Sequence, residues 1–96
     1  MPDSYRVISS SHFDRDYKGL ARRNPLAISH VEVMVEALKQ DPYNRSRQHN
    51  IKKLRGVKKG EGQWRIASGD YRIRYDIFGR DVLLYSCKHR REVYQE

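Results

Sequence analysis

Residues 63–88 read QWRIASGDYRIRYDIFGRDVLLYSCK, and this stretch decides the fold. Apolar and polar side chains alternate along it, as they do in strands that bury one face. Two turn signals divide it, Ser68-Gly69-Asp70 and Phe78-Gly79-Arg80-Asp81, because glycine next to polar residues favours a tight reversal. We therefore expect three consecutive strands, over Gln63–Ala67, Tyr71–Phe78 and Val82–Lys88.

A strand and two helices are expected before this stretch. Tyr5–Ser9 is rich in aromatic and β-branched residues, which predicts a short first strand. Apolar residues then recur at helical spacing, first from Phe13 to Ala21 and, after a restart at Asn24-Pro25, from Ile28 to Leu38. The order β-α-α-β-β-β predicts an α+β fold in which a helical hairpin packs on one face of an antiparallel-rich sheet.

Residues 45–59 differ in composition from the rest of the chain. They hold seven Lys or Arg residues and no acid, with Ile51, Leu54 and Val57 as their aliphatic residues. We interpret this segment as a basic loop that the three aliphatic residues attach to the core. The whole net charge of +8 lies in residues 45–96, since the basic and acidic residues before them balance. A basic excess confined to one half of a chain indicates a polyanionic partner, usually a nucleic acid.

Length and composition limit the remaining possibilities. The 96 residues form one domain, residues 1–96. Cys87 is the only cysteine, so no intrachain disulfide forms, and a reducing cytoplasm is the expected location. No apolar segment is long enough to span a membrane, so no membrane partner is expected.

Three arginines share the face of the sheet that lies away from the core. The alternation places Arg65, Arg72 and Arg74 on this face, and a short turn puts Arg65 opposite Arg74 and Ala67 opposite Arg72. Like charges directly opposite each other destabilise a sheet. Guanidinium groups held together in this way favour a phosphate ligand, which arginine binds through two hydrogen bonds. The alternative is a solvated face whose arginines spread apart.

His89 is the titratable residue that stands out, because it follows the last strand and precedes two arginines. Histidine both donates and accepts protons near neutral pH. The histidines at 12, 30 and 49 lack metal-ligand spacing, so no metal site and no cofactor are expected.

Four ordered motifs carry a resemblance to a known family. They are Lys53-Leu54-Arg55-Gly56, Trp64-Arg65-Ile66, Gly69-Asp70-Tyr71-Arg72-Ile73-Arg74-Tyr75 and His89-Arg90-Arg91-Glu92-Val93-Tyr94. In this order they resemble the RelE family of type II toxins, within the RelE/ParE superfamily. The resemblance implies a RelE-like fold of the microbial-ribonuclease type and a toxin that cuts mRNA in the ribosomal A site, next to ribosomal RNA. It also implies a cognate antitoxin that wraps the toxin with an acidic segment.

The resemblance also implies roles for single residues. Arg72 matches the arginine that stabilises the transition state, and Arg65 a basic residue near the attacking group. His89 matches the general acid, and Tyr94 a tyrosine that orients the 2′-hydroxyl or stacks on a base. Further cations are expected to bind RNA: Lys52, Lys53, Arg55, Arg74, Arg90 and Arg91.

One position departs from the family pattern. Ala67 stands where well-known members have a second basic residue, so the general base stays open, with Arg74 as a possible substitute for that residue. Two other functions remain as alternatives. One is a ParE-like toxin that poisons DNA gyrase without cutting nucleic acid. His89 and Tyr94 favour the nuclease over this alternative. The other is an RNA-binding module without activity.

Overall fold

The computed structural model describes residues 4–93, which form a five-stranded sheet and three helices. The elements in chain order are β1 (Arg6–Ser9), α1 (Ser11–Arg23), α2 (Leu26–Gln40), β2 (Ile51–Lys53), β3 (Trp64–Ser68), β4 (Tyr71–Phe78), β5 (Asp81–His89) and α3 (Arg90–Val93). The expected α+β class and the helical hairpin are confirmed. None of the helices in this part of the chain is long and apolar enough to cross a membrane.

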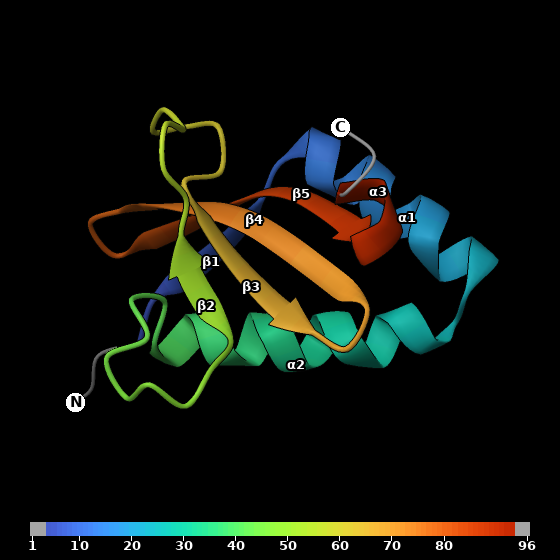
Figure 1. Cartoon of the computed structure of the whole chain (residues 1–96), viewed down its shortest axis with the longest axis horizontal. Coiled ribbons are helices and arrows are strands. Elements are labelled where there is room, and N and C mark those ends of the chain that lie inside the picture. Colours follow the sequence, from blue (N-terminus) through green and yellow to red (C-terminus); the bar gives the residue numbers. More distant parts are fainter. Residues whose placement is uncertain (1–3, 94–96) are drawn as a thin grey trace.

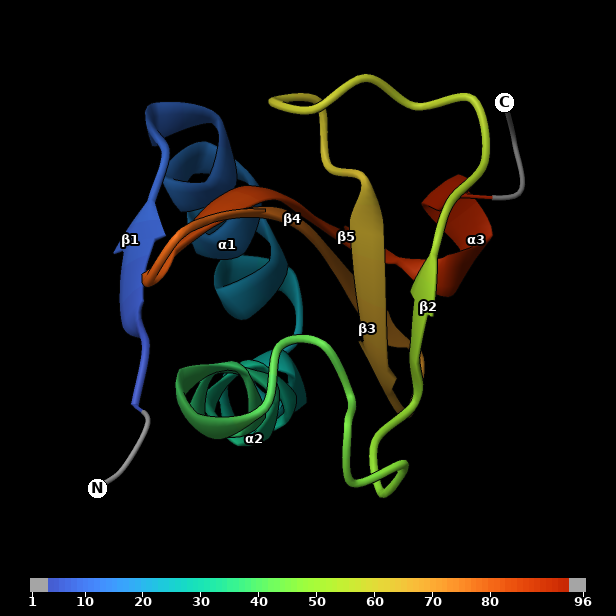
Figure 2. The same cartoon turned by 90° about the vertical axis from the view of Figure 1, so that its left-hand side faces the viewer.

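The strands lie in the order β1-β5-β4-β3-β2. The pair β1–β5 is parallel, and the other three pairs are antiparallel, so the sheet is rich in antiparallel pairs as expected. Figure 1 shows α2 running along one side of the sheet, and Figure 2, which looks along α2, shows the sheet curving over it. The side of the sheet away from α2 is the face on which the three arginines were expected (Figure 1).

Local sequence signals set the helix ends. The Ser10 hydroxyl accepts a hydrogen bond from the Phe13 N–H at 3.0 Å and thereby caps α1. The Asn24 side chain accepts one from the Leu26 N–H at 3.1 Å at the start of α2. A tight turn at Gly69 reverses the chain between β3 and β4, where Ser68 pairs with Tyr71 and Gly69 has a φ of +58°. A Cβ atom at Gly69 would also lie 2.7 Å from the His30 ring, so both backbone conformation and space require glycine there.

Two segments differ from the expectation. Ile51–Lys53 forms β2, although residues 45–59 were expected to be a loop throughout. Ile51 pairs with Ile66 and Lys52 with Arg65, so β2 covers the open edge of β3. Three residues are too few to show an alternating pattern, and the strand exists because β3 offers it hydrogen-bonding partners. After β5, the expected tail forms the short helix α3, which Glu92 stabilises by accepting a hydrogen bond from the His89 N–H at 2.9 Å.

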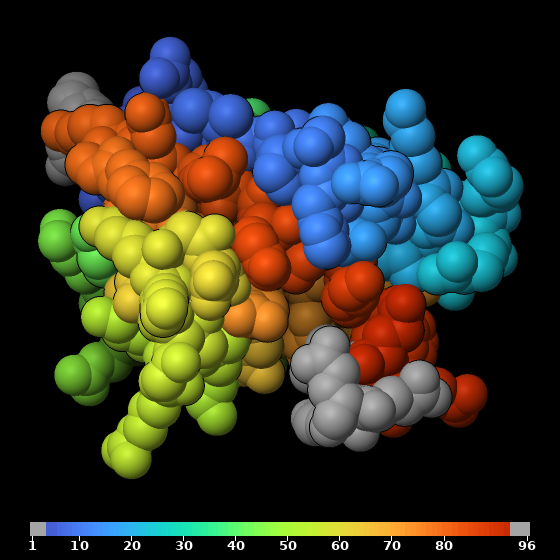
Figure 3. Space-filling model, turned by 90° about the horizontal axis from the view of Figure 1, so that it is seen from above, coloured from blue at the N-terminus to red at the C-terminus, as the bar shows by residue number. Residues whose placement is uncertain are grey.

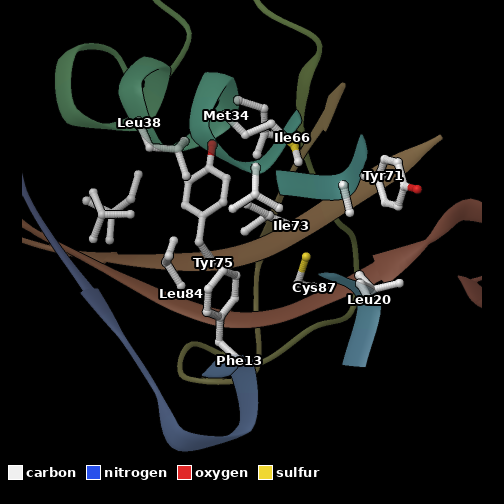
Figure 4. Packing of buried hydrophobic residues seen from close by; sticks show 14 residues of the cluster. Phe13, Leu20, Met34, Leu38, Ile66, Tyr71, Ile73, Tyr75, Leu84 and Cys87 are labelled. Atoms are coloured by element: carbon white, nitrogen blue, oxygen red, sulfur yellow. The ribbon is translucent and has the colours of Figure 1, made fainter. Parts of the chain in front are cut away.

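The core lies between the helices and the concave face of the sheet. Figure 4 shows Phe13 and Leu20 of α1 and Met34 and Leu38 of α2 packed against strand residues such as Ile73. Tyr75 is fully buried among them, and its hydroxyl donates a hydrogen bond to the Pro42 carbonyl at 2.8 Å. This bond attaches the segment after α2 to the central strand.

We expect Tyr75→Phe to lower the free energy of unfolding by about 1–2 kcal/mol, because the Pro42 carbonyl loses its buried donor. Urea unfolding at neutral pH measures the change. Tyr43→Phe is the control, since the Tyr43 side chain is exposed and its loss of a hydroxyl should change stability by less than about 0.5 kcal/mol. Equal losses in the two variants would contradict the role of this bond.

Candidate nucleic-acid interface

Five cations lie on the face of the sheet that points away from the core. The register pairs Arg65 with Arg74 and Ala67 with Arg72, as expected. The neighbouring strands add two lysines, because Lys52 pairs with Arg65 and Lys88 pairs with Arg72. We call these five residues the basic face: Lys52, Arg65, Arg72, Arg74 and Lys88. Lys88 was missed by the sequence analysis.

A bulge in β5 explains why Lys88 was missed. Arg74 pairs with Ser86 and Tyr75 with Leu84, so Tyr85 is an extra residue without a partner in β4. An unbroken alternation from Val82 would put His89 on the basic face. The extra residue reverses the alternation, so Lys88 takes that place instead.

His89 therefore lies on the helix-facing side of the sheet, opposite the buried Tyr71. Its ring meets the Tyr71 ring edge-on, with 5.4 Å between the centroids. Its Nε2 lies 3.9 Å from a carboxylate oxygen of Asp70, and its Nδ1 accepts a hydrogen bond from the Arg91 N–H at 3.2 Å. His89 thus lines a small hollow with Leu20 and Arg23 of α1. The arginines of the basic face lie on the other side of the sheet.

The arginines of the basic face have different partners. Arg74 donates to the carbonyls of Glu61 and Gly62, at 2.6 and 3.1 Å, so it holds the loop before β3. Arg65 donates to the Asn50 side chain at 3.1 Å. Arg72 donates through Nη1 alone to the Gly69 and Tyr71 carbonyls. Within residues 4–93, this arrangement leaves Nε and Nη2 of Arg72 for an anion.

Asp76 also holds the loop before β3, which Arg74 contacts. Its carboxylate is fully buried and accepts hydrogen bonds from the backbone N–H groups of Gly62 and Gln63, at 2.8 and 3.0 Å. Arg74 and Asp76 together make residues 54–63 a wall beside the basic face. Figure 3 shows this loop on one side and α1 on the other, with atoms of β4 recessed between the loop and α3.

The other expected RNA-binding residues lie at the rim. Lys52 and Arg55 are exposed, and the Lys53 ammonium lies over the Trp64 ring, 5.7 Å from its centroid. Arg90 forms an ion pair with Asp70 at 3.3 Å, and its N–H donates to the Asp70 carbonyl. Arg91 is exposed. Tyr94 lies outside the described residues.

α1 covers the end of β5 that β1 does not reach. β1 ends where Ser9 meets Leu84, and beyond this point Asp16 of α1 accepts a hydrogen bond from the Cys87 N–H at 3.0 Å. The other Asp16 oxygen lies 3.4 Å from the Lys88 ammonium. Asp16 thus closes the edge of the sheet and holds Lys88 at the same time. In residues 4–93, no group of three or more His, Cys, Asp or Glu side chains could hold a metal ion.

Cys87 is buried in the core. Burial, with a smaller contribution from the Asp16 charge, raises the pKa of its thiol to about 12. The thiolate is therefore scarce in the folded protein below that pH.

We expect a thiol reagent at pH 8 to modify Cys87 slowly in the native protein and rapidly in urea, followed by absorbance of the released thiolate. The raised pKa also makes folding less favourable as the pH rises above about 9, because the unfolded chain loses the thiol proton first. Cys87→Ala should remove this part of the alkaline loss. Rapid labelling of the native protein would contradict the burial of the thiol.

Two solved structures have a similar fold. One is the RelBE2 toxin–antitoxin complex from Mycobacterium tuberculosis, with 26% sequence identity and a TM-score of 0.67 over 91% of this chain and 99% of that chain. The other is the RelB–RelE antitoxin–toxin complex from Methanococcus jannaschii, with 24% identity and a TM-score of 0.58 over 93% of this chain and 96% of that chain. No family model and no curated protein matches the sequence. The chain is therefore similar in structure to chains found in toxin–antitoxin complexes.

Proposed function

We propose that this chain is the toxin of a toxin–antitoxin pair and a RelE-like endoribonuclease that cuts mRNA in the ribosomal A site. The basic face carries the proposal, because five cations on four adjacent strands match a polyanion better than they match one another. The similarity to toxin–antitoxin structures supports the pairing with an antitoxin.

The chemistry of the proposal needs no group beyond RNA and side chains. The 2′-oxygen attacks the adjacent phosphorus, the bond from phosphorus to the 5′-oxygen breaks, and the 2′-hydroxyl proton passes to a base. Negative charge grows on the phosphate oxygens, where Arg72 and Lys88, paired across β4 and β5, stabilise it. Arg65 extends this cationic surface toward β2. An acid finally protonates the departing 5′-oxygen.

We assign the acid to His89 and the orientation of the 2′-hydroxyl to Tyr94 on the resemblance to the RelE family. His89 ends β5, one residue after Lys88, and its ring lies on the helix-facing side of the sheet, so its role rests on the resemblance alone. Lys52, Lys53 and Arg55 at the rim bind the RNA backbone, as do Arg90 and Arg91 at the start of α3. Arg74 contributes mainly by holding the loop.

The partners follow from the charge. An acidic antitoxin segment complements the basic face and competes with RNA for it, while ribosomal and messenger RNA supply phosphates. The cytoplasm, where ribosomes and reduced thiols occur, is the proposed location.

The decisive test is mRNA cleavage by the purified chain on ribosomes with an empty A site. We expect cut mRNA with ribosomes and intact mRNA without them, and cleavage should weaken steeply as salt rises. Intact mRNA together with gyrase-dependent DNA breaks would replace this proposal with the gyrase-poisoning alternative. RNA binding without any cut would leave the binding module.

A further inference from the structure

A second histidine, His12, lies beside the basic face. It is in the first turn of α1, which runs along the end of β5 that β1 leaves uncovered. Its ring stacks on the Tyr85 ring, with 5.5 Å between the centroids and 19° between the planes. The Arg74 guanidinium lies 5.5 Å from the centroid of the same Tyr85 ring. The bulge that turns Tyr85 outward thus connects His12 with the basic face.

Asp16 orients His12 in turn. One turn further along α1, its Oδ2 lies 3.3 Å from Nε2 of His12. The same carboxylate is bound by the Cys87 N–H and by the Lys88 ammonium, so it does not move freely. Its side chain is 15% exposed, whereas that of His12 is 48% exposed. A fixed carboxylate therefore holds a histidine ring that remains open to solvent.

The two ring nitrogens have different surroundings. Nε2 lies 3.3 Å from the Asp16 carboxylate, so Nδ1 is the nitrogen that remains to accept a proton from a substrate. Within residues 4–93 no hydrogen bond to Nδ1 is seen. The carboxylate lies beside one ring nitrogen while the other stays accessible, as in the aspartate–histidine pair of a hydrolase triad.

The position fits the step whose base the sequence left open. Lys88, the other partner of Asp16, pairs with Arg72 across the sheet. A phosphate between Arg72 and Lys88 therefore lies one side chain away from the His12–Asp16 pair. His89 lies on the opposite side of the sheet, against Tyr71.

Resting on the proposed function, we propose that His12 is the general base and Asp16 its positioning residue. The 2′-hydroxyl of the bound RNA gives its proton to Nδ1 of His12 while the 2′-oxygen forms its bond to phosphorus. The bond from phosphorus to the 5′-oxygen breaks, and an acid protonates the 5′-oxygen. His12 then returns its proton to water.

The test is single-turnover cleavage of mRNA on ribosomes with an empty A site. We expect His12→Ala to slow cleavage about 100-fold, the usual size of a lost general base, and added imidazole to restore part of the rate. His12→Gln, which fills the space but cannot take the proton, should be equally slow. Asp16→Asn keeps an oxygen for the Cys87 N–H and should slow cleavage about 10-fold, because it removes the carboxylate that positions the His12 ring.

His49→Ala is the matched control. His49 also has an aspartate beside its Nε2, Asp41 at 3.8 Å, but it lies near the end of α2, away from the basic face. The His49→Ala variant should cleave at the parent rate and show no response to imidazole. If the parent cuts mRNA and His12→Ala cuts equally fast, or is slow without imidazole rescue, the inference is overturned and the proposed function stands. If the parent cuts no mRNA, the proposed function and the inference fail together.

Discussion

Arg72→Ala should lower the rate of mRNA cleavage on ribosomes by about 10²–10³-fold, the usual cost of removing one group that stabilises charge in a transition state. Arg72 lies in the middle of the basic face, between Ala67 and Lys88, and Nε and Nη2 of its guanidinium face no other partner within residues 4–93. Its two hydrogen bonds reach only carbonyls of the neighbouring turn, so the fold should survive the change. Single-turnover rates and growth arrest in cells measure the loss.

Two further variants serve as controls for this prediction. Arg22→Ala removes an exposed arginine from the last turn of α1 and should cleave at the parent rate. Arg72→Lys keeps the charge but loses the planar pair of donors, so an intermediate rate is expected. A fully toxic Arg72→Ala would place the phosphate elsewhere on the chain.

Asp76→Ala should cost about 2–5 kcal/mol of unfolding free energy, the largest loss of stability that we expect from one side chain. Its carboxylate is fully buried, and without it the N–H groups of Gly62 and Gln63 lose their side-chain acceptor. Small domains have about 5–15 kcal/mol of stability in all, so the variant should be partly unfolded at moderate temperature. Urea unfolding measures the global loss.

Hydrogen exchange separates the local effect from the global one. The amides of Gly62 and Gln63 should lose protection first, because Arg74 alone then holds the loop. Asp81→Ala is the control, since Asp81 pairs with an exposed Arg6 at the surface and should cost less than about 1 kcal/mol. A comparable loss from the two aspartates would contradict the role of Asp76.

Alternation in the sequence was enough to predict the central strands and the arginines of the outward face. Arg65 and Arg74 face each other because the two-residue turn at Gly69 fixes the register, and both signals are local. β2 could not be predicted in the same way, since its three residues form a strand only against β3.

The side of the sheet on which His89 lies could not be predicted, for a different reason. One unpaired residue, Tyr85, exchanges the two sides of the sheet for everything after it, and no residue type announces a bulge of this kind. His12 was set aside because it lacks metal-ligand spacing, and it lies 53 residues before Arg65, the first arginine of the basic face. Only the packing of α1 along β5 brings it beside the basic face.

The parallel pairing of β1 with β5 decides when the sheet can form during synthesis. β1 leaves the ribosome well before β5, the strand with which it pairs. Contacts between distant segments form late, because the chain between them must first be closed into a loop. A nascent chain that lacks β5 has neither the partner of β1 nor Lys88. The sheet is therefore complete only after β5 has been synthesised.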